Sequence, residues 1–445
     1  MFKKITLFIT SVLLMAGGVF AQTNVAPGDG TLKDAIASAS DGDILVLSSG
    51  GLYTESQDTT IVIDKMITIK AEAGYTERPI IKNTSIAAGS VLPDNLHNMF
   101  TFTDTSGIRI VGVELDGNMH TDSSTYRPVE DIFAFSLDGF FHKVNVLSLD
   151  DCFVHGFSER VLDGAEGVYD QRGLEIDSIL VTNSTLRGGL NGFNFKTYPI
   201  NDYILFQNST FYEFGWGRAL RMQGSDPQYG GMIDHVTLHD YRDQMLYIRD
   251  VTNSWTIQNV IASAQWNKAK ESIRLDGAGN TLSYTALWDV SDLFAGDSVI
   301  VDSTSLFFVD PMFADTTNGN FALVEGSELI GAASDGANIG DTRWGTTTAV
   351  GVEDGELPTE FKLSQNYPNP FNPTTTIQFA LNKTGFVEVK IYNIIGQLVT
   401  TLANREFDAG IHKLQFDAGR LSSGIYIYNV QFDNKSETRK MLLLK

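Results

Sequence analysis

TNSTL at residues 182–186 returns, with substitutions, as QNSTF at 207–211, DHVTL at 234–238, QNVIA at 258–262 and SYTAL at 283–287. The offsets between successive segments are 25, 27, 24 and 25 residues. Gly, Asn and Asp separate short β-branched stretches, and helical periodicity is nearly absent. A near-constant period built from short strands predicts a β-solenoid, whose coils stack at a strand spacing of about 4.8 Å. A β-sandwich also has many short strands, but it would not repeat the same residues at this offset.

A solenoid places residues one period apart in columns, apolar where they point inward and polar where they face water. The chain has 445 residues, of which 42% are apolar, enough for a long core and a small second domain. Its one cysteine, Cys152, excludes an intrachain disulfide and is expected in a buried stack. The formal charge of -22 argues against a nucleic-acid-binding protein, which needs a basic surface.

The N-terminus has the parts of a secretory signal peptide. Lys3 and Lys4 precede a mostly apolar run over 5–20, and Ala21 closes a cleavage site of small residues. We therefore predict a signal peptide at 1–21. No later apolar run is long enough to span a bilayer, so the exported protein is expected to have no membrane span. It is also expected to be a monomer.

Residues 22–345 are predicted to form the solenoid, with a cap at its start. The stretch 31–55 predicts a short amphipathic helix, an Asp-Gly turn and an apolar strand. A helix over the first coil hides its open strand edge. This opening resembles the N-terminal cap of right-handed parallel β-helix proteins of the pectate-lyase type. Residues 310–345 resemble the closing segment of many secreted β-helix proteins.

The C-terminal part is predicted to be a separate domain. Residues 346–357, rich in Thr, Gly and acidic residues, predict a linker before a domain at 358–445. The alternation of Val387, Val389 and Ile391 predicts a small antiparallel β-sandwich. NYPNPFNP, VKIYNIIGQLV and SGIYIY occur in this order, and the domain resembles the C-terminal sorting domains of type IX secretion substrates. The resemblance implies the type IX secretion machinery as a partner and a secreted or cell-surface location.

Four basic residues recur with the period of the solenoid. Lys196, Arg221, Arg249 and Arg274 each follow an apolar residue, at offsets of 25, 28 and 25. If the apolar residues point inward, alternation turns all four outward in one column, about 5 Å apart at the backbone. Like charges in a row repel, so a polyanion is the expected partner, and arginine suits the carboxylates of a uronic acid polysaccharide. Alternatively, neighbouring acids neutralise the column; the candidates are Glu213, Asp250, Glu271 and Asp276.

NGFNFKT at 191–197, followed by NSTFYEFGWGRALRMQG at 208–224, is similar to polysaccharide lyase family 6, the family of alginate lyases and chondroitinase B. The resemblance implies that Lys196 is the general base, that Arg221 is the catalytic arginine and that Arg274 contacts substrate. It implies β-elimination from a uronate, in which a base removes the C5 proton while the carboxylate is neutralised.

Further residues are expected to serve the same chemistry. Repulsion from Arg218 and Arg221 favours the neutral lysine that a base requires. The remaining expected substrate contacts are Arg218, Arg249, Tyr198 and Tyr247. The candidates for returning a proton to the leaving oxygen are Tyr198, Tyr212 and Tyr247.

Several positions depart from the family's pattern. The family's two calcium-binding glutamates correspond here to Gly189 and Asn191, its serine to Thr197 and its histidine to Met222. No metal-binding residues are therefore predicted; calcium is left open as a cofactor, and arginine alone would neutralise the carboxylate. A non-catalytic cell-surface β-helix that binds glycan or serves in adhesion is the alternative function.

Other patterns point to other functions. Asp150 and Asp151 match the paired aspartates of polygalacturonase-like glycoside hydrolases, although adjacent strand residues face opposite ways and a third acid would be needed. His235 and His239 share a face if HVTLH is a strand, without a third metal ligand nearby in sequence. The candidate sugar-stacking aromatics are Trp216, Trp266, Tyr198 and Tyr241.

Overall fold

A computed structural model of the chain divides into two compact units. The first comprises Met1–Met312 with Phe321–Thr346, and the second comprises Phe313–Asn320 with Thr347–Lys445. The structure describes residues 20–55, 60–83, 86–87, 98–103, 105–118, 126–127, 129–135, 143–163, 175–195, 200–215, 218–223, 230–249, 254–291, 293–296, 298–347, 361–363, 366, 371, 373–394, 397–407, 410–419, 421–432 and 435–443.

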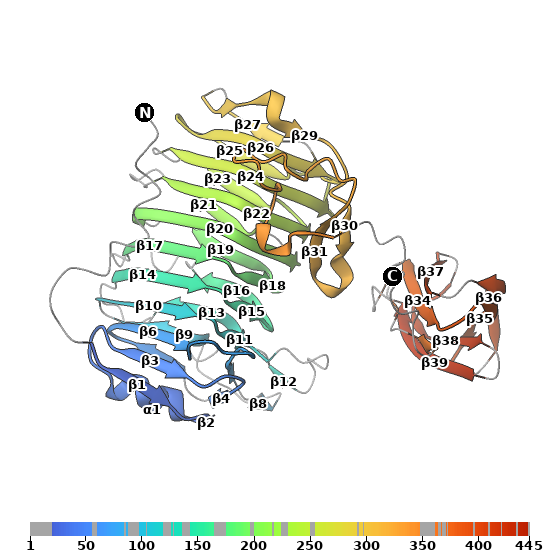
Figure 1. The fold of residues 1–445 in the computed structure, drawn as a ribbon, viewed down its shortest axis with the longest axis horizontal. Coiled ribbons are helices and arrows are strands. Elements are labelled where there is room, and N and C mark those ends of the chain that lie inside the picture. The colour runs from blue at the N-terminus through green and yellow to red at the C-terminus, as the bar shows by residue number, and fades with distance from the viewer. Residues whose placement is uncertain are drawn as a thin grey trace. The chain divides into compact units, whose positions relative to one another are not determined.

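The first unit is a parallel β-helix, in which two long sheets run side by side along a stack of coils (Figure 1). The larger sheet contains β1 (Gln22–Val25), β2 (Gly28–Asp29), β3 (Ile44–Leu47), β4 (Leu52–Glu55), β6 (Met66–Ala71), β7 (Ile80–Asn83), β10 (Thr105–Val111), β11 (Glu114–Asp116), β14 (Lys143–Asp150), β15 (Phe153–His155), β17 (Glu175–Thr182), β18 (Thr185–Arg187), β20 (Ile200–Phe214), β22 (Gly231–Tyr241), β24 (Trp255–Gln265), β26 (Thr281–Trp288), β28 (Ile300–Val301) and β29 (Leu306–Phe307). The nine-stranded sheet contains β5 (Ile61–Ile63), β9 (Asn98–Phe102), β13 (Val129–Phe135), β16 (Phe157–Asp163), β19 (Asn191–Phe195), β21 (Leu220–Gln223), β23 (Leu246–Arg249), β25 (Ile273–Leu275) and β27 (Leu293–Ala295). Neighbouring strands pair in parallel from one coil to the next, which confirms the predicted fold class.

The repeated segments lie one above another, residue for residue. Thr182 pairs with Gln207, and the same position continues through Asp234 and Gln258 to Ser283. The residue that follows each of them turns a corner in the left-handed backbone region. These corner residues are Asn183, Asn208, His235, Asn259 and Tyr284, with φ of 50°, 45°, 52°, 56° and 46°. Asparagine tolerates this region better than most residues, which explains why it recurs in the repeat.

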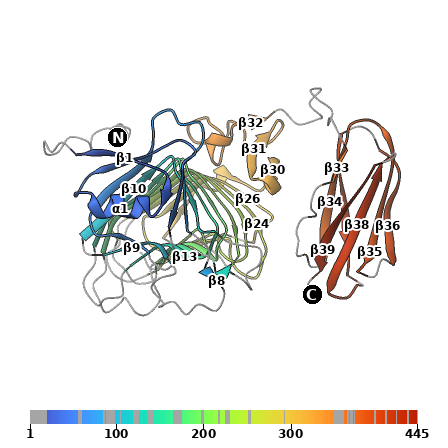
Figure 2. The same ribbon diagram turned by 90° about the horizontal axis from the view of Figure 1, so that it is seen from below.

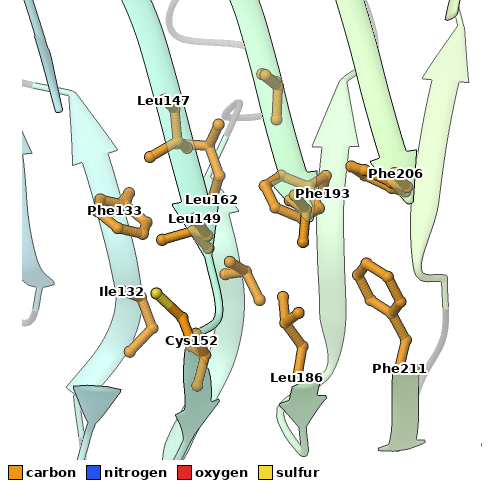
Figure 3. Close-up of a cluster of buried hydrophobic side chains, with 14 of the residues drawn as sticks. Ile132, Phe133, Leu147, Leu149, Cys152, Leu162, Leu186, Phe193, Phe206 and Phe211 are labelled. Atoms are coloured by element: carbon orange, nitrogen blue, oxygen red, sulfur yellow. The ribbon is translucent and has the colours of Figure 1, made fainter. Parts of the chain in front are cut away.

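Inward side chains from successive coils form a continuous apolar core (Figure 3). The ring of Phe206 lies 5.2 Å from those of both Phe193 and Phe211. Cys152 is 1% exposed, and burial raises the pKa of its thiol to about 12. The predicted buried position of this cysteine is confirmed. Each large side chain buried in this way contributes roughly 1.5–3 kcal/mol.

The predicted cap is present at the N-terminal end of the stack. Helix α1 (Thr31–Ser38) buries Leu32 and Ile36 against the first coils, at the end of the stack that faces the viewer in Figure 2. Lys65 donates from Nζ to the carbonyls of Ile36 at 3.3 Å and Ala39 at 3.1 Å. These bonds place a positive charge at the carbonyl end of the helix, where it is favourable.

The closing segment of the first unit runs back across four coils. We call residues 334–344 the strap; they include the 3₁₀ turn η3 (Thr342–Trp344). The strap meets the corner residues in reverse order. These contacts join Ser334 to Asn259, Gly340 to His235, Thr342 to Asn208 and Arg343 to Asn183. One segment therefore ties four coils together, in addition to their strand pairing and core packing.

The second unit contains two antiparallel sheets, as predicted. They are β33 (Lys362–Leu363), β34 (Thr374–Leu381) and β37 (Gly410–Asp417), and β36 (Leu398–Phe407), β35 (Gly385–Asn393), β38 (Gly424–Phe432) and β39 (Lys435–Leu443). Val387, Val389 and Ile391 are fully buried in its core. Thr346–Thr347, the first residues of the predicted linker, form strand β32, and the rest of that linker lies outside the described residues.

Among the described residues, no helix is long and apolar enough to cross a membrane. The predicted signal peptide lies outside this part of the chain except for its last two residues.

Candidate functional site

The outer surface of the nine-stranded sheet carries the predicted arginines. In β21, Arg221 is partly exposed between two fully buried neighbours. β23 and β25 alternate in the same way, which turns Tyr247, Arg249 and Arg274 outward. Arg218 precedes β21 and is also partly exposed. We call the surface formed by Arg218, Arg221, Tyr247, Arg249 and Arg274 the arginine face.

The register of the strands corrects the predicted single column of cations. Arg221 pairs with Tyr247, and Tyr247 pairs with Arg274, whereas Arg249 lies two residues further along and pairs with Gln223. Buried residues on either side of these positions fix the register, because one slipped residue would turn apolar side chains to water. Tyr247 thus separates the backbones of Arg221 and Arg274 by two strand spacings, roughly 10 Å, which reduces their repulsion.

Three guanidinium groups converge on the ring of Tyr247. The central carbon lies 5.2 Å from the ring centroid in Arg218, 5.5 Å in Arg221 and 5.9 Å in Arg274. Arg249 donates to the Tyr247 hydroxyl at 3.4 Å. An aromatic ring attracts cations at such distances, so Tyr247 holds the guanidinium groups together that would otherwise repel one another.

Two acids partly neutralise this cluster, as the alternative interpretation of the sequence anticipated. Asp276 accepts from Arg274 at 3.1 Å and lies 4.0 Å from Arg249, and Glu271 lies 3.7 Å from Arg274. Glu271 and Asp276 therefore offset part of the positive charge of the arginine face. Of the other candidate acids, Glu213 pairs with Arg187 and Asp250 lies outside the described residues.

A second row of polar residues, which the sequence interpretation missed, borders the arginines. Arg218 donates to Gln244 at 3.0 Å, and Gln244 donates to Glu271 at 3.2 Å. These three residues precede three successive strands, at offsets of 26 and 27 residues, so the same period could have revealed them. Asn194, the residue that pairs with Arg221 on β19, was also missed.

The neighbouring Asp243 has a pKa below its ordinary value. Burial alone would raise it, but hydrogen bonds from Asn267 and Lys270 and the positive charges of Lys270 and Arg218 outweigh this. Asp243 is consequently a carboxylate that holds Lys270 at 2.9 Å and fixes the loop beside the arginine face.

Several predicted residues lie outside the described part of the chain, namely Lys196, Thr197, Tyr198 and Trp216. Two predicted aromatic roles are wrong. Tyr212 is 5% exposed on β20, in the larger sheet, with its ring 5.0 Å from that of Phe321. Tyr241 is fully buried and stacks on Phe214 at 5.3 Å, so neither ring can reach a sugar on the arginine face.

The positions that correspond to the family's calcium ligands do not suit carboxylates. Gly189 adopts φ of 78°, and a Cβ there would lie 2.1 Å from the ring of Phe157. Among the described residues, no group of three or more His, Cys, Asp or Glu side chains could hold a metal ion. Gly189 therefore has no room for the carboxylate that the corresponding calcium ligand would require.

The other patterns prove to be structural. Asp150 accepts from Thr182 at 2.7 Å and from Asn183 at 2.8 Å, while Asp151 is held by Tyr75 and Arg78. Both acids are thus engaged at a corner of the larger sheet, and the hydrolase alternative has no support.

The two histidines of HVTLH have different surroundings. His235 lies at a corner beneath the strap, within 3.2 Å of the carbonyls of Asn338 and Gly340. His239 bonds to Ser263 at 2.9 Å, and burial lowers the pKa of His239 to about 4. They do not form a shared site.

Fold and tail together define the class: an exported parallel β-helix protein. Residues 365–444 match the secretion system C-terminal sorting domain. The C-terminal domain is therefore a sorting domain of the type IX system, and the protein is exported to be secreted or displayed at the cell surface. No curated protein matches the chain by sequence.

Among solved structures, the β-helix is similar to the family 6 alginate lyase AlyGC, at 20% identity over 66% of this chain with a TM-score of 0.39. An arginine-to-alanine mutant of that enzyme matches at 19% identity over 66% of this chain with a TM-score of 0.38. The matched part spans 40% of the length of either lyase chain. Similarity this low carries no argument about substrate or mechanism, which must come from the residues of the arginine face.

Proposed function

We propose that the arginine face binds a polysaccharide of uronic acids and that the exported protein cleaves it by β-elimination. The supporting observation is the convergence of Arg218, Arg221 and Arg274 on the ring of Tyr247. Guanidinium groups pair with carboxylates through two parallel hydrogen bonds. Because the ring already holds these cations together, the arginine side chains lose little conformational entropy when a carboxylate binds.

The proposed chemistry assigns one role to each group. Arg221 binds the carboxylate of the uronate and stabilises the negative charge that grows there as the C5 proton leaves. Lys196, which follows β19 in sequence, is assigned the removal of that proton, and repulsion from Arg218 and Arg221 would favour its neutral form. The C5–H electrons form the C4–C5 double bond while the C4–O bond breaks. Tyr247 donates the proton that the leaving oxygen takes up.

The test uses the full chain with alginate, polygalacturonate and chondroitin sulfate. We expect one polymer to give an unsaturated product that absorbs in the ultraviolet. Lys196→Met should lower this rate by about 10²- to 10⁴-fold, the usual contribution of a general base, while binding stays intact. Arg221→Ala should weaken both binding and turnover. If no polymer is bound by the wild-type protein, the proposal is wrong.

A second candidate is a glycan-binding protein without catalysis. The observation that favours it is the tight contact of Gly189 with Phe157, which leaves no room for a carboxylate that could bring calcium to help neutralise the substrate. Salt-sensitive binding to a polyuronate without any unsaturated product, at any calcium concentration, would select this candidate.

A further inference from the structure

Trp266 directly follows β24 and has no role in the proposed chemistry. It is 63% exposed and begins the loop, residues 266–272, that connects β24 to β25. Near its other end the same loop carries Glu271, which joins the hydrogen-bonded row at the arginine face. One short segment thus carries both the indole and a carboxylate that pairs with Arg274 of the arginine face.

This loop is firmly held on the preceding coil. The Trp266 backbone N–H donates to the carbonyl of Tyr241 at 2.8 Å, and its indole N–H donates to the carboxylate of Asp240. Asn267 donates to Asp243 at 2.9 Å, and Lys270 pairs with the same carboxylate. A large apolar side chain that is exposed yet fixed by its one polar atom is pre-organised to receive an apolar surface.

We propose that Trp266 is a stacking platform for a sugar ring of the bound polysaccharide, at a subsite outside the uronate held by the arginines. The apolar C–H face of a pyranose suits an exposed indole, and the sugar hydroxyls stay in water. The link of this loop through Glu271 to a cationic face favours a sugar over a protein partner, because the same polymer chain offers carboxylates to the arginines and ring faces to the indole. The inference rests on the proposed function, since it extends the same face.

The test measures binding of the full-length protein to oligouronates of two to eight residues, prepared from whichever polymer the wild-type protein binds. Trp266→Ala should weaken binding of the longer oligomers by about fivefold and leave the disaccharide unchanged, because the disaccharide fills only the arginine site. Trp266→Phe should restore part of the loss. Trp288→Ala is the matched control, because Trp288 is 42% exposed but lies on β26, outside the loop that carries Trp266 and Glu271. We expect no change from that variant.

Salt separates the two contributions to binding. The loss caused by Trp266→Ala should be the same at low and high salt, whereas that of Arg221→Ala should shrink as salt screens the charges. Asp240→Ala removes the hydrogen bond that fixes the indole but leaves the indole in place, so it should cause an intermediate loss of binding. Equal binding by wild type and Trp266→Ala at every length overturns the inference alone. A loss that includes the disaccharide also overturns it, because it shows damage to the arginine site, and failure of the wild type to bind any polyuronate overturns both proposals.

Discussion

Asp341 anchors the strap, and its replacement by asparagine gives a quantitative test of that role. The Asp341 side chain is fully buried and accepts from Thr210 at 2.7 Å and from the Arg343 Nε at 3.0 Å. Arg343 in turn donates to the carbonyls of Asn183 at 2.7 Å and Ser184 at 2.8 Å. Asp341→Asn keeps the shape of the side chain but removes the charge that holds the guanidinium group in this position.

The expected cost follows from the burial of the pair. Removing one partner of a buried ion pair costs about 3–5 kcal/mol, and the Arg343 side chain, which is 25% exposed, recovers some hydration. We therefore expect the lower end, about 3 kcal/mol, which corresponds to roughly 150-fold in the opening equilibrium of the strap. Because the strap lies outside the coils, the loss should appear as local opening and not as global unfolding.

Native-state amide exchange measures this opening directly. Gly340 donates its amide to Asn259, and Asp341 donates its amide to Thr237, so both amides should exchange about 150-fold faster in Asp341→Asn. Amides in the buried strands should not change. Asp335→Asn is the control, because the Asp335 side chain is 59% exposed and its contact with His235 should contribute less than about 1 kcal/mol. Equal strap exchange in wild type and Asp341→Asn would refute the reasoning.

Three further predictions concern the arginine face, pH and calcium. Tyr247→Leu should leave three guanidinium groups without their shared ring, and we expect roughly tenfold weaker binding of the polyuronate with little loss of stability, measured by calorimetry. Burial lowers the pKa of His239 from 6.5 to about 4 and raises that of Asp240 from 3.8 to about 6. The unfolded histidine gains its proton first as pH falls below 6.5, so His239 lowers stability toward pH 4, whereas Asp240 lowers stability as pH rises from about 4 to 6. His239→Gln should therefore unmask a free energy of unfolding that falls with rising pH in that window, and an unchanged profile in urea denaturation would contradict this. Gly189→Asp should destabilise the protein through its clash with Phe157, and it should not produce a calcium-dependent rise in thermal midpoint.

The sequence by itself determined the fold class and the destination of the protein. The period near 25 residues and the recurring asparagines predicted stacked coils, because identical corners need residues that tolerate the left-handed region. The alternation of Val387, Val389 and Ile391 predicted the sandwich, and its motifs predicted the sorting domain. These features are local in the sequence, so each can be recognised without knowing which residues contact it in the folded protein.

Only the tertiary structure decided which side chains meet. Offsets of 25, 28 and 25 suggested one column of cations, yet strand pairing inserted Tyr247 between Arg221 and Arg274 and moved Arg249 to the next position. Loops between coils differ in length by a few residues, and sequence alone does not say where the extra residue falls. Packing of buried neighbours decides it, because a slip of one residue would expose a whole row of apolar side chains. The same holds for the strap, whose Asp341 lies 131 positions from Thr210 in sequence and 2.7 Å from it in space.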